Sequence, residues 1–320
     1  MAKSIGTCAL IVHGGAGAIG PANERASRKR GMLEAVRRGA AILRRGGTAL
    51  DAVTASVAAL EDDPLFNAGY GSLLNSEGAV EMDASVMVAR PQADGRIGLH
   101  AGAVAAITRV KNPVLLARAV MEKTGHLLMA GPAAERFARK AGIPLCRAED
   151  LISERARERW RARMQRENRA NLVAERAQAH GTVGAVALDV HGQLAAATST
   201  GGVPGKMAGR VGDSAIIGAG VYADAVGAAS ATGHGEAIIM SALCREAVHL
   251  LGRSTPTRAA QLAITRLIAP QGAEAGIVLI DTGGRIGYAH NADSMDVGTF
   301  HSAKGISHRR AAANAAKPRG

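Results

Sequence analysis

The sequence predicts a layered α/β protein in which helices cover antiparallel β-sheets. Two hairpins carry this prediction, because residues 183–199 and 277–290 each contain two apolar runs joined by a short turn with glycine. Pairs of helical segments lie between the hairpins, an order typical of a sandwich with helices outside. Apolar residues make up 47% of the 320 residues and aromatic residues only 2%. We therefore expect a core built from Ala, Val, Leu and Ile.

The N-terminal half alternates strands and helices. The apolar run at residues 8–12 predicts a strand, and the glycine-rich residues 13–20 predict a turn after it. Thr48 and Asp51 form the pattern of a helix N-cap followed by an acidic first turn. The other elements expected are helices at 22–45, ended by Gly46 and Gly47, at 49–61, at 113–124 and at 131–141, a loop at 64–71, and strands at 78–87 and 98–107 around a turn at 92–95.

A charged segment separates the two halves. Residues 146–180 contain no glycine and are dense in Arg and Glu, so we expect a helical or disordered linker there. The tail from residue 302 is rich in Ala, Arg and Lys, a composition that predicts disorder. Between them we expect strands at 183–188, 194–199, 216–221, 275–281 and 285–290, a glycine-rich loop at 201–212, and helices at 235–251 and 256–267.

The formal net charge of +12 raises an alternative, a non-enzymatic protein that binds a polyanion. The arginines, however, are scattered over helical stretches such as 25–45 and 155–176, where charges usually form solvated faces. Three Phe, three Tyr and one Trp offer few platforms on which bases could stack. We expect no nucleic-acid partner, and polyanion binding stays a remote alternative.

Cys8, Cys146 and Cys244 are far apart and odd in number, which disfavours a disulfide framework or a cysteine metal site and fits a reducing cytoplasm. The apolar run at residues 8–12 is too short for a secretory signal. No stretch of about 18 apolar residues occurs, so we expect no membrane span.

Residues 15–20 match the G-x-G-x-x-G pattern directly after a strand. In a dinucleotide-binding unit this pattern opens a helix, and a second strand ending in an acidic residue follows. Here Pro21 follows at once and the next two elements are helical. We interpret the pattern as a turn in which glycines let the backbone approach neighbouring strands.

The residues 180–189, HGTVGAVALD, indicate chemistry. A threonine hydroxyl is a weak nucleophile, and a free α-amine on the same residue can serve as its base, with a pKa of roughly 7.7. Thr182 could gain such an amine only if the chain broke before it. Attack of its hydroxyl on the Gly181 carbonyl would give an ester, whose hydrolysis would free the amine. A lone Gly-Thr would more often just begin a strand, so its surroundings decide the interpretation.

Eight ordered motifs give these surroundings, and they resemble the plant-type asparaginases, or isoaspartyl aminopeptidases, among the N-terminal-nucleophile hydrolases. The resemblance covers about residues 8–300. The motifs are LIVHGGAGAI (10–19), ALDAVTASVAALEDDPLFNAGYGS (49–72), EMDASVM (81–87), HAGAVAAI (100–107), HGTVGAVALD (180–189), AAATSTGG (195–202), GRVGDS (209–214) and ATGHGE (231–236).

The resemblance implies a four-layer αββα sandwich cut between Gly181 and Thr182 into an α chain (1–181) and a β chain (182–320). The two chains would form one domain and pair as (αβ)₂. Thr182 would be the nucleophile, with Thr200 orienting its hydroxyl. The implied substrates are L-asparagine and β-aspartyl peptides.

The resemblance also implies how the substrate is held. Thr232 and Gly233 would form the oxyanion hole. Arg210 would bind the substrate α-carboxylate and Asp213 its α-ammonium, in a pocket completed by Val211, Gly212, His234, Gly235 and Asn67. No catalytic cofactor is implied, but a structural sodium ion is, bound by the backbone carbonyls of Leu60, Glu61, Asp63, Phe66, Ala68 and Tyr70.

Two features depart from the family pattern. His234 stands where Thr or Ser is common, so we expect it to narrow the pocket or to alter the pH response. Residues 289–298 resemble the family only loosely. A glycosylasparaginase of the same superfamily is the nearer alternative, although such relatives carry a secretory signal and many disulfides, which this sequence does not predict.

Overall fold

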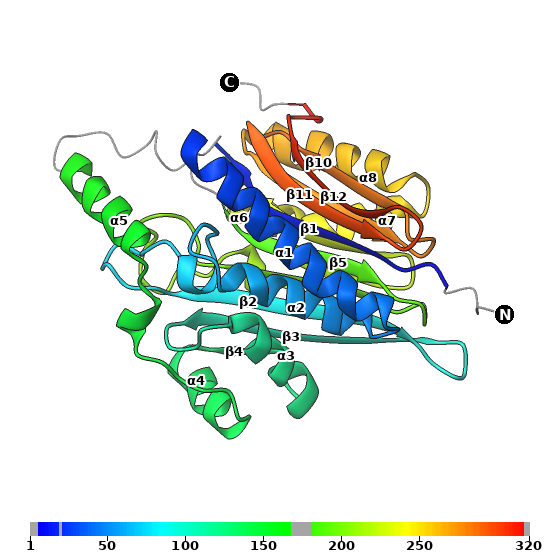
Figure 1. Ribbon diagram of the computed structural model, residues 1–320, viewed down its shortest axis with the longest axis horizontal. Helices are drawn as coiled ribbons and strands as arrows, with labels where there is room; N and C mark the ends of the chain where they lie inside the picture. Colours follow the sequence, from blue (N-terminus) through cyan, green and yellow to red (C-terminus); the bar gives the residue numbers. More distant parts are fainter. Residues whose placement is uncertain (1–5, 19–20, 168–180, 317–320) are drawn as a thin grey trace.

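The computed structural model describes residues 6–18, 21–167 and 181–316, and it shows two stacked β-sheets between outer layers of helices (Figure 1). The larger sheet has the strand order β12-β11-β1-β5-β6-β2-β3-β4, and the smaller one β10-β9-β8-β7. The strands are β1 (Ala9–Gly17), β2 (Met82–Pro91), β3 (Ile97–Ile107), β4 (Leu128–Ala130), β5 (Val183–Leu188), β6 (Leu194–Thr200), β7 (Val221–Ala223), β8 (Gly227–Gly233), β9 (Ala275–Asp281), β10 (Ile286–His290), β11 (Ser294–His301) and β12 (Gly305–Ala311).

The helices cover the outer face of each sheet. Helices α1, α2 and α3 pack on the larger sheet, and α7 and α8 pack on the smaller one. The four-layer αββα architecture expected from the sequence is therefore confirmed. The helices are α1 (Arg25–Arg44), α2 (Ala49–Glu61), α3 (Pro113–Lys123), α4 (Gly131–Lys140), α5 (Glu154–Glu167), α6 (Gly235–Ser241), α7 (Leu243–Leu251) and α8 (Pro256–Ala263).

Strand β5 shows why the central strands are apolar on both faces. Successive side chains of a strand point to opposite sides of the sheet. Val183 and Ala185 pack in the core beneath the helices, whereas Val186 and Leu188 pack in the core between the two sheets. Both faces of β5 are therefore buried inside the sandwich, and Thr182 directly precedes its N-terminal end.

The local signals of the N-terminal half are confirmed. The Thr48 hydroxyl accepts a hydrogen bond from the backbone N–H of Asp51 at 3.1 Å and caps α2. Gly46 has φ 75° and follows α1, which ends where the glycine pair predicts. The turn between β2 and β3 is closed by a hydrogen bond from the Gln92 N–H to the Arg96 carbonyl.

The predicted glycine-rich turn after residue 12 is wrong over its described part. Strand β1 continues to Gly17, because its backbone pairs with β11 on one side and through His13 with β5 on the other. A bulge between His13 and Ala16 bends the strand, and Gly15 lies there with φ 102°, a conformation that favours glycine. Ile19 and Gly20, the end of that turn, lie outside the described residues.

Three further predictions differ from the structure. Residues 216–221 do not form a strand. A 3₁₀ turn, Asp213–Ala215, precedes them, and only a bridge from Ile217 to Val221 is present. Strands β4 and β8 were not predicted, since GAASATG in β8 has none of the large β-branched residues that signal a strand. The single helix expected at 235–251 is two helices separated by Ala242, which has φ 46°.

The described part of the charged segment contains the helix α5, one of the two expected outcomes, but this helix is not a detached linker. In α5 the Ala156 side chain is buried, and the Trp160 indole N–H donates to the Asn75 carbonyl at 3.1 Å. The expected disorder of the tail is also wrong for its described part, because Gly305–Ala311 forms β12 and pairs with β11. Residues 168–180 and 317–320 lie outside the described residues.

Within the described residues, no helix is long and apolar enough to cross a membrane. In the same part of the chain, His, Cys, Asp and Glu side chains nowhere gather in a group of three or more that could hold a metal ion. Cys8, Cys146 and Cys244 are all free thiols.

Candidate active site

The proposed nucleophile lies at the entry to the central strand β5. Val183 pairs with Ser199 in the antiparallel ladder, which brings Thr182 beside Thr200 at the end of β6. The two hydroxyl oxygens are 3.2 Å apart, and both residues are buried. The Thr182 hydroxyl donates to the Thr200 oxygen, which also accepts the N–H of Gly202 at 3.0 Å.

Gly181, the residue before the nucleophile, is enclosed on two sides. A side chain on Gly181 would come within 2.9 Å of the Asn67 Cβ, and one on Gly15 would come within 2.7 Å of the Gly181 Cα. Asn67 is held in turn, since its amide donates to the Gly202 carbonyl at 2.7 Å and its side-chain oxygen accepts the Leu73 N–H. The Gly181–Thr182 peptide is therefore packed closely against its neighbours.

A small cavity of about 10 Å³ opens at the nucleophile. Its lining combines residues from the linker end, the β6 end, the loop after β6 and the β8 end: Gly181, Thr182, Thr200, Gly202, Val203, Arg210, Asp213 and Gly233. The sequence motifs predicted that Arg210 and Asp213 lie together at Thr182, and the structure brings them there.

Arg210 is already paired in this structure. Its Nε and Nη2 atoms lie 3.0 Å and 2.9 Å from the Glu236 Oε1. Glu236 is the residue after Gly235 in the ATGHGE motif, and the sequence analysis gave it no role. An incoming carboxylate must share Arg210 with Glu236 or displace it.

Asp213 is buried behind Arg210. Burial raises the pKa of its carboxyl to about 7, and the positive charge of Arg210 opposes the rise. The neighbouring glycines are needed by this packing, because a side chain at Gly212 would meet the Arg210 guanidinium at 2.7 Å and one at Gly235 would meet it at 2.6 Å. Val211 lies between these groups and is half-buried.

The proposed oxyanion groups lie at the end of β8. The Thr232 hydroxyl accepts the Ala16 N–H of β1 at 3.3 Å and is fully buried. Gly233 follows with φ 141° and lines the small cavity. His234 is directed elsewhere: its Nδ1 accepts the Ala237 N–H and caps α6, and the ring is not among the groups that line the small cavity.

Comparison with known proteins agrees with this geometry. The family described as Asparaginase matches residues 6–309. An isoaspartyl peptidase/L-asparaginase of Danio rerio is 47% identical over 277 residues, which cover 86% of each chain. The protein of the same name from Mus musculus is 46% identical over 86% of this chain and 82% of its own. A plant-type L-asparaginase of Pyrococcus abyssi is 41% identical over 90% of this chain and 94% of its own.

The chain belongs to the asparaginase family. The matched range includes Gly181, Thr182 and every residue of the small cavity. It also includes most of β12, the strand that the tail composition did not predict.

Three buried groups in this asparaginase site were missed by the sequence analysis. Asp83 of β2 accepts the Gly212 N–H at 2.9 Å and the Ala106 N–H at 3.0 Å, which fixes the loop that carries Arg210. The Lys206 ammonium donates to the Glu81 carbonyl at 2.9 Å. Both Glu81 and Asp83 belong to the EMDASVM motif, which signalled importance but no role.

His13 of β1 is the third missed group. Its Nε2 lies 2.9 Å from the Ser230 hydroxyl of β8, and a side chain at Gly184 would collide with both. Burial lowers the pKa of His13 to about 3, and the nearby Thr182 backbone offsets this only in part. At neutral pH the ring is uncharged and a poor base, so it serves to pack β1 and β5 against the smaller sheet.

The proposed sodium loop folds back on itself. Gly69 lies close to the Glu61 carbonyl, and Gly71 lies close to the carbonyls of Phe66 and Asp63. Gly69 has φ 55°, which this close approach requires. Carbonyl oxygens are suitable ligands for a hard cation, and the sodium site stays a prediction.

Proposed function

We propose that the protein is a self-cleaving hydrolase that converts L-asparagine to L-aspartate and ammonia and cleaves β-aspartyl peptides. The observation that carries this proposal is the buried pair of hydroxyls of Thr182 and Thr200, of which Thr182 directly follows Gly181. Both residues line a cavity that Arg210 and Asp213 also line. Relatives at 46–47% identity are named isoaspartyl peptidase/L-asparaginase, which supports both activities.

Self-cleavage comes first in this proposal. The Thr182 oxygen attacks the Gly181 carbonyl carbon, the peptide C–N bond breaks, and an ester joins the two residues. Water then hydrolyses the ester and leaves a carboxylate on Gly181 and a free α-amine on Thr182. Residues 1–181 and 182–320 become two chains that stay folded together, because β5 and β6 pair with β1 and β2 of the first chain.

The free amine then serves as the base for substrate. It accepts the Thr182 hydroxyl proton as the oxygen attacks the β-carbonyl of the substrate, and it returns a proton to the leaving nitrogen. The product of this step is an aspartyl ester on Thr182, which water hydrolyses. Thr232 and the Gly233 N–H stabilise the negative oxygen of each tetrahedral intermediate.

The substrate is held by its α-substituents. Arg210 binds the α-carboxylate and ionised Asp213 binds the α-ammonium, and Val211, Gly212 and Gly235 lie beside these two side chains. This orientation directs the β-carbonyl, rather than an α-linked peptide, toward Thr182. It supports activity on β-linked bonds.

Two features of the assembly belong to the same proposal. The cut chains pair as (αβ)₂, and the protein acts in the cytoplasm. The free state of all three cysteines supports a reducing compartment.

The test is the intact mass of the purified protein at neutral pH, followed by assays with L-asparagine and β-Asp-Leu. We expect two fragments, the smaller beginning at Thr182, and release of ammonia or leucine. A chain that stays whole and inactive would refute the proposal. Faster turnover of a glycosylated asparagine than of β-Asp-Leu would instead favour the glycosylasparaginase alternative.

A further inference from the structure

A second and much larger cavity lies on the other side of Gly181. Its volume is about 470 Å³, within the range of about 300–1,000 Å³ typical of small-molecule sites. Gly181 lines both this cavity and the small one at Thr182. The wall includes the backbone of β1, the loop after α2, one side of α5 and the ends of β11 and β12. This arginine-lined cavity has no role in the proposed function.

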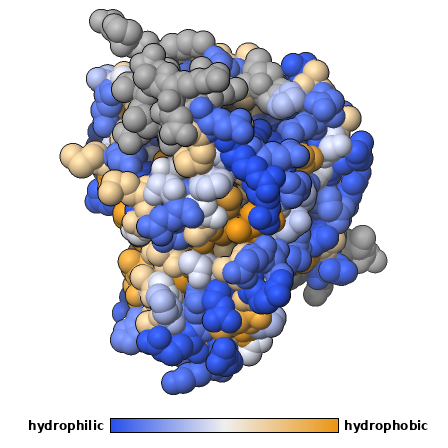
Figure 2. Space-filling view, turned by 90° about the vertical axis from the view of Figure 1, so that its left-hand side faces the viewer, coloured by the Kyte–Doolittle hydropathy of each residue, from blue (hydrophilic) through white to orange (hydrophobic). Residues whose placement is uncertain are grey.

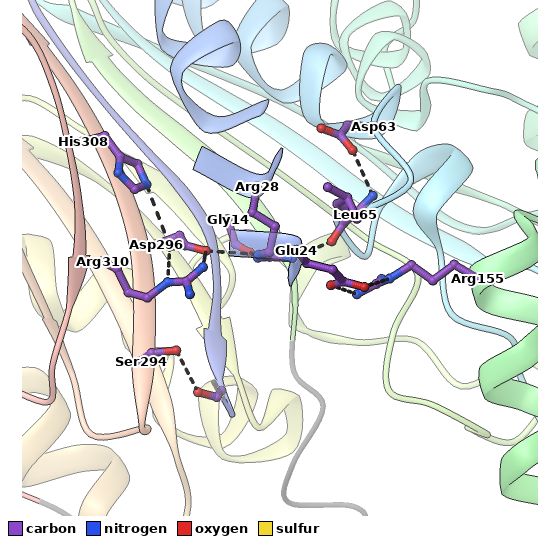
Figure 3. A network of polar contacts seen from close by, with 11 residues as sticks. Gly14, Glu24, Arg28, Asp63, Leu65, Arg155, Ser294, Asp296, His308 and Arg310 are labelled. Atoms are coloured by element: carbon purple, nitrogen blue, oxygen red, sulfur yellow. Dashed lines mark hydrogen bonds and ion pairs between the residues drawn. The ribbon is translucent and has the colours of Figure 1, made fainter. Parts of the chain in front are cut away.

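The cavity has an excess of positive charge. Among the described residues, five arginines line it (Arg28, Arg155, Arg159, Arg163 and Arg310), but only two acidic residues do (Glu24 and Asp296). Figure 3 shows the two acidic groups between arginines that come from different elements. Asp296 lies 2.8 Å from Arg310 and 3.2 Å from Arg28, and Glu24 lies 2.8 Å from Arg155. The acidic groups therefore neutralise only part of the charge.

The paired arginines are fixed in place. Arg28 also donates to the carbonyls of Gly14 and Leu65, so it joins β1 to the loop that carries Asn67. Burial favours the neutral form of Asp296, yet its bonds to Arg310 and Arg28 prevail and hold its pKa below the ordinary value. This network forms a rigid, charged wall rather than a set of solvated side chains.

Arg159 differs from the other four arginines. Among the residues that the structure describes, none forms a hydrogen bond or an ion pair with its guanidinium. Arg159 is exposed to solvent, yet partial desolvation lowers the pKa of its guanidinium, and the like charge of Arg155 adds to this effect. An anion in the cavity would satisfy the guanidinium and offset the repulsion between the two arginines.

The chemistry of the site indicates what reaches this cavity. The leaving nitrogen of a substrate takes its proton from the Thr182 α-amine, so it must lie within hydrogen-bond reach of that nitrogen. In the uncut chain the Thr182 nitrogen is bonded to the carbonyl carbon of Gly181, and Gly181 lines the arginine-lined cavity. A group attached to the leaving nitrogen is therefore directed to the cavity, while Arg210 and Asp213 hold the aspartyl part on the other side.

We propose that the arginine-lined cavity binds the leaving residue of β-aspartyl peptides and, through Arg159, favours leaving residues with an acidic side chain. This inference rests on the proposed function and adds the class of preferred peptide. L-Asparagine releases only ammonia and does not use the cavity.

The test compares kcat/KM of the self-cleaved protein for β-Asp-Glu, β-Asp-Gln and β-Asp-Lys. These leaving residues are similar in size and differ in side-chain charge. We expect β-Asp-Glu to exceed β-Asp-Gln by about threefold, the size of a solvent-accessible ion pair, and β-Asp-Lys to be slowest. The preference should shrink as the salt concentration rises, because salt screens accessible charges.

Arg159→Gln and Arg161→Gln form a matched pair of variants. Both remove one positive charge from α5, but Arg161 does not line the cavity and is 60% exposed. We expect the Glu/Gln ratio to fall to about one in Arg159→Gln and to stay at the wild-type value in Arg161→Gln. Equal rates for the three peptides in the wild type, or the same fall in both variants, would overturn the inference.

The wild-type rates also separate this inference from the proposed function. Hydrolysis of L-asparagine with no preference among the three peptides would overturn the role of the cavity alone. A protein that neither cleaves itself nor releases ammonia from L-asparagine would refute the proposed function, and the inference with it.

Discussion

The two cavities that Gly181 lines differ in volume, in charge and in the elements that form them. On the nucleophile side, a cavity of about 10 Å³ holds two hydroxyls and one Arg–Asp pair. On the other side, the described residues that line a cavity of about 470 Å³ include five arginines and two acids. Figure 2 shows the face of the molecule on the side where Figure 1 draws α5, with mostly hydrophilic residues around smaller hydrophobic areas near its middle.

In our proposals the small cavity contains the groups that perform the reaction, whereas the large cavity selects among leaving residues. The groups at Thr182 must be positioned within fractions of an ångström. Thr182 and Thr200 lie beside the start of β5 and at the end of β6, and Arg210 and Asp213 lie in the segment between β6 and β7. A site that only selects among leaving residues tolerates longer distances and water. It can be built from separate elements, as Arg28, Arg155 and Arg310 show.

The largest expected effect tests the nucleophile side. Thr182→Ala removes the attacking oxygen, so we expect a single uncut chain with no detectable hydrolysis of either substrate class. Intact mass and ammonia release measure the two outcomes. A cut chain in this variant would show that another group attacks Gly181.

Thr200 tests whether one hydroxyl orients the nucleophile for both reactions. Thr200→Ala should slow self-cleavage and turnover by roughly 100-fold each, comparable to the loss of one positioned donor in an active site. Thr200→Ser, which keeps the hydroxyl, should retain most of both rates. Normal self-cleavage in the alanine variant would limit the role of Thr200 to substrate turnover.

Arg210 sharpens the comparison between the arginine of the small cavity and those of the large one. The Arg210→Ala variant should cleave itself normally, since self-cleavage does not require binding of a substrate carboxylate. It should raise KM for L-asparagine roughly 30-fold, a loss of about 2 kcal/mol for one partner of a charged pair. Steady-state kinetics on the cut variant measure this, and an unchanged KM would remove Arg210 from the substrate site.

Asp213 gives a pH-dependent effect rather than a single fold-change. Burial raises its pKa to about 7. Below that pH its carboxyl is protonated and cannot pair with the substrate ammonium, so binding of L-aspartate should weaken by about tenfold for each pH unit further down. Above it, the carboxyl is ionised and binding should level off.

The inhibition constant of L-aspartate measured from pH 5 to pH 9 shows this change. Asp213→Asn, which cannot ionise, should bind weakly at every pH and lose the step near pH 7. A step that persists in this variant would assign the titration to another group, such as the Thr182 α-amine.

Local pattern was sufficient for much of the fold. The hairpin of β5 and β6 and the cap of α2 by Thr48 follow from alternation and short polar signals, which act over a few residues. Strand β8 was missed because GAASATG has low strand propensity, and it is held by its neighbours β7 and β9. The same tertiary pairing extends β1 through its glycines and orders β12.

The sequence by itself predicted Thr182 as the nucleophile, Thr200 as its partner and Arg210 with Asp213 as the substrate-binding pair, because each lies in a short motif whose residue types and order are specific. Only the tertiary structure decided that Glu236 pairs with Arg210, that Asp83 fixes the loop of Arg210, and that Asp296 and Glu24 pair with arginines other than Arg159. Those contacts join residues from separate elements, some more than 100 positions apart, and antiparallel pairing and helix docking bring them together. No local periodicity encodes such distances, so the charge of the large cavity could be known only after the sheets were packed.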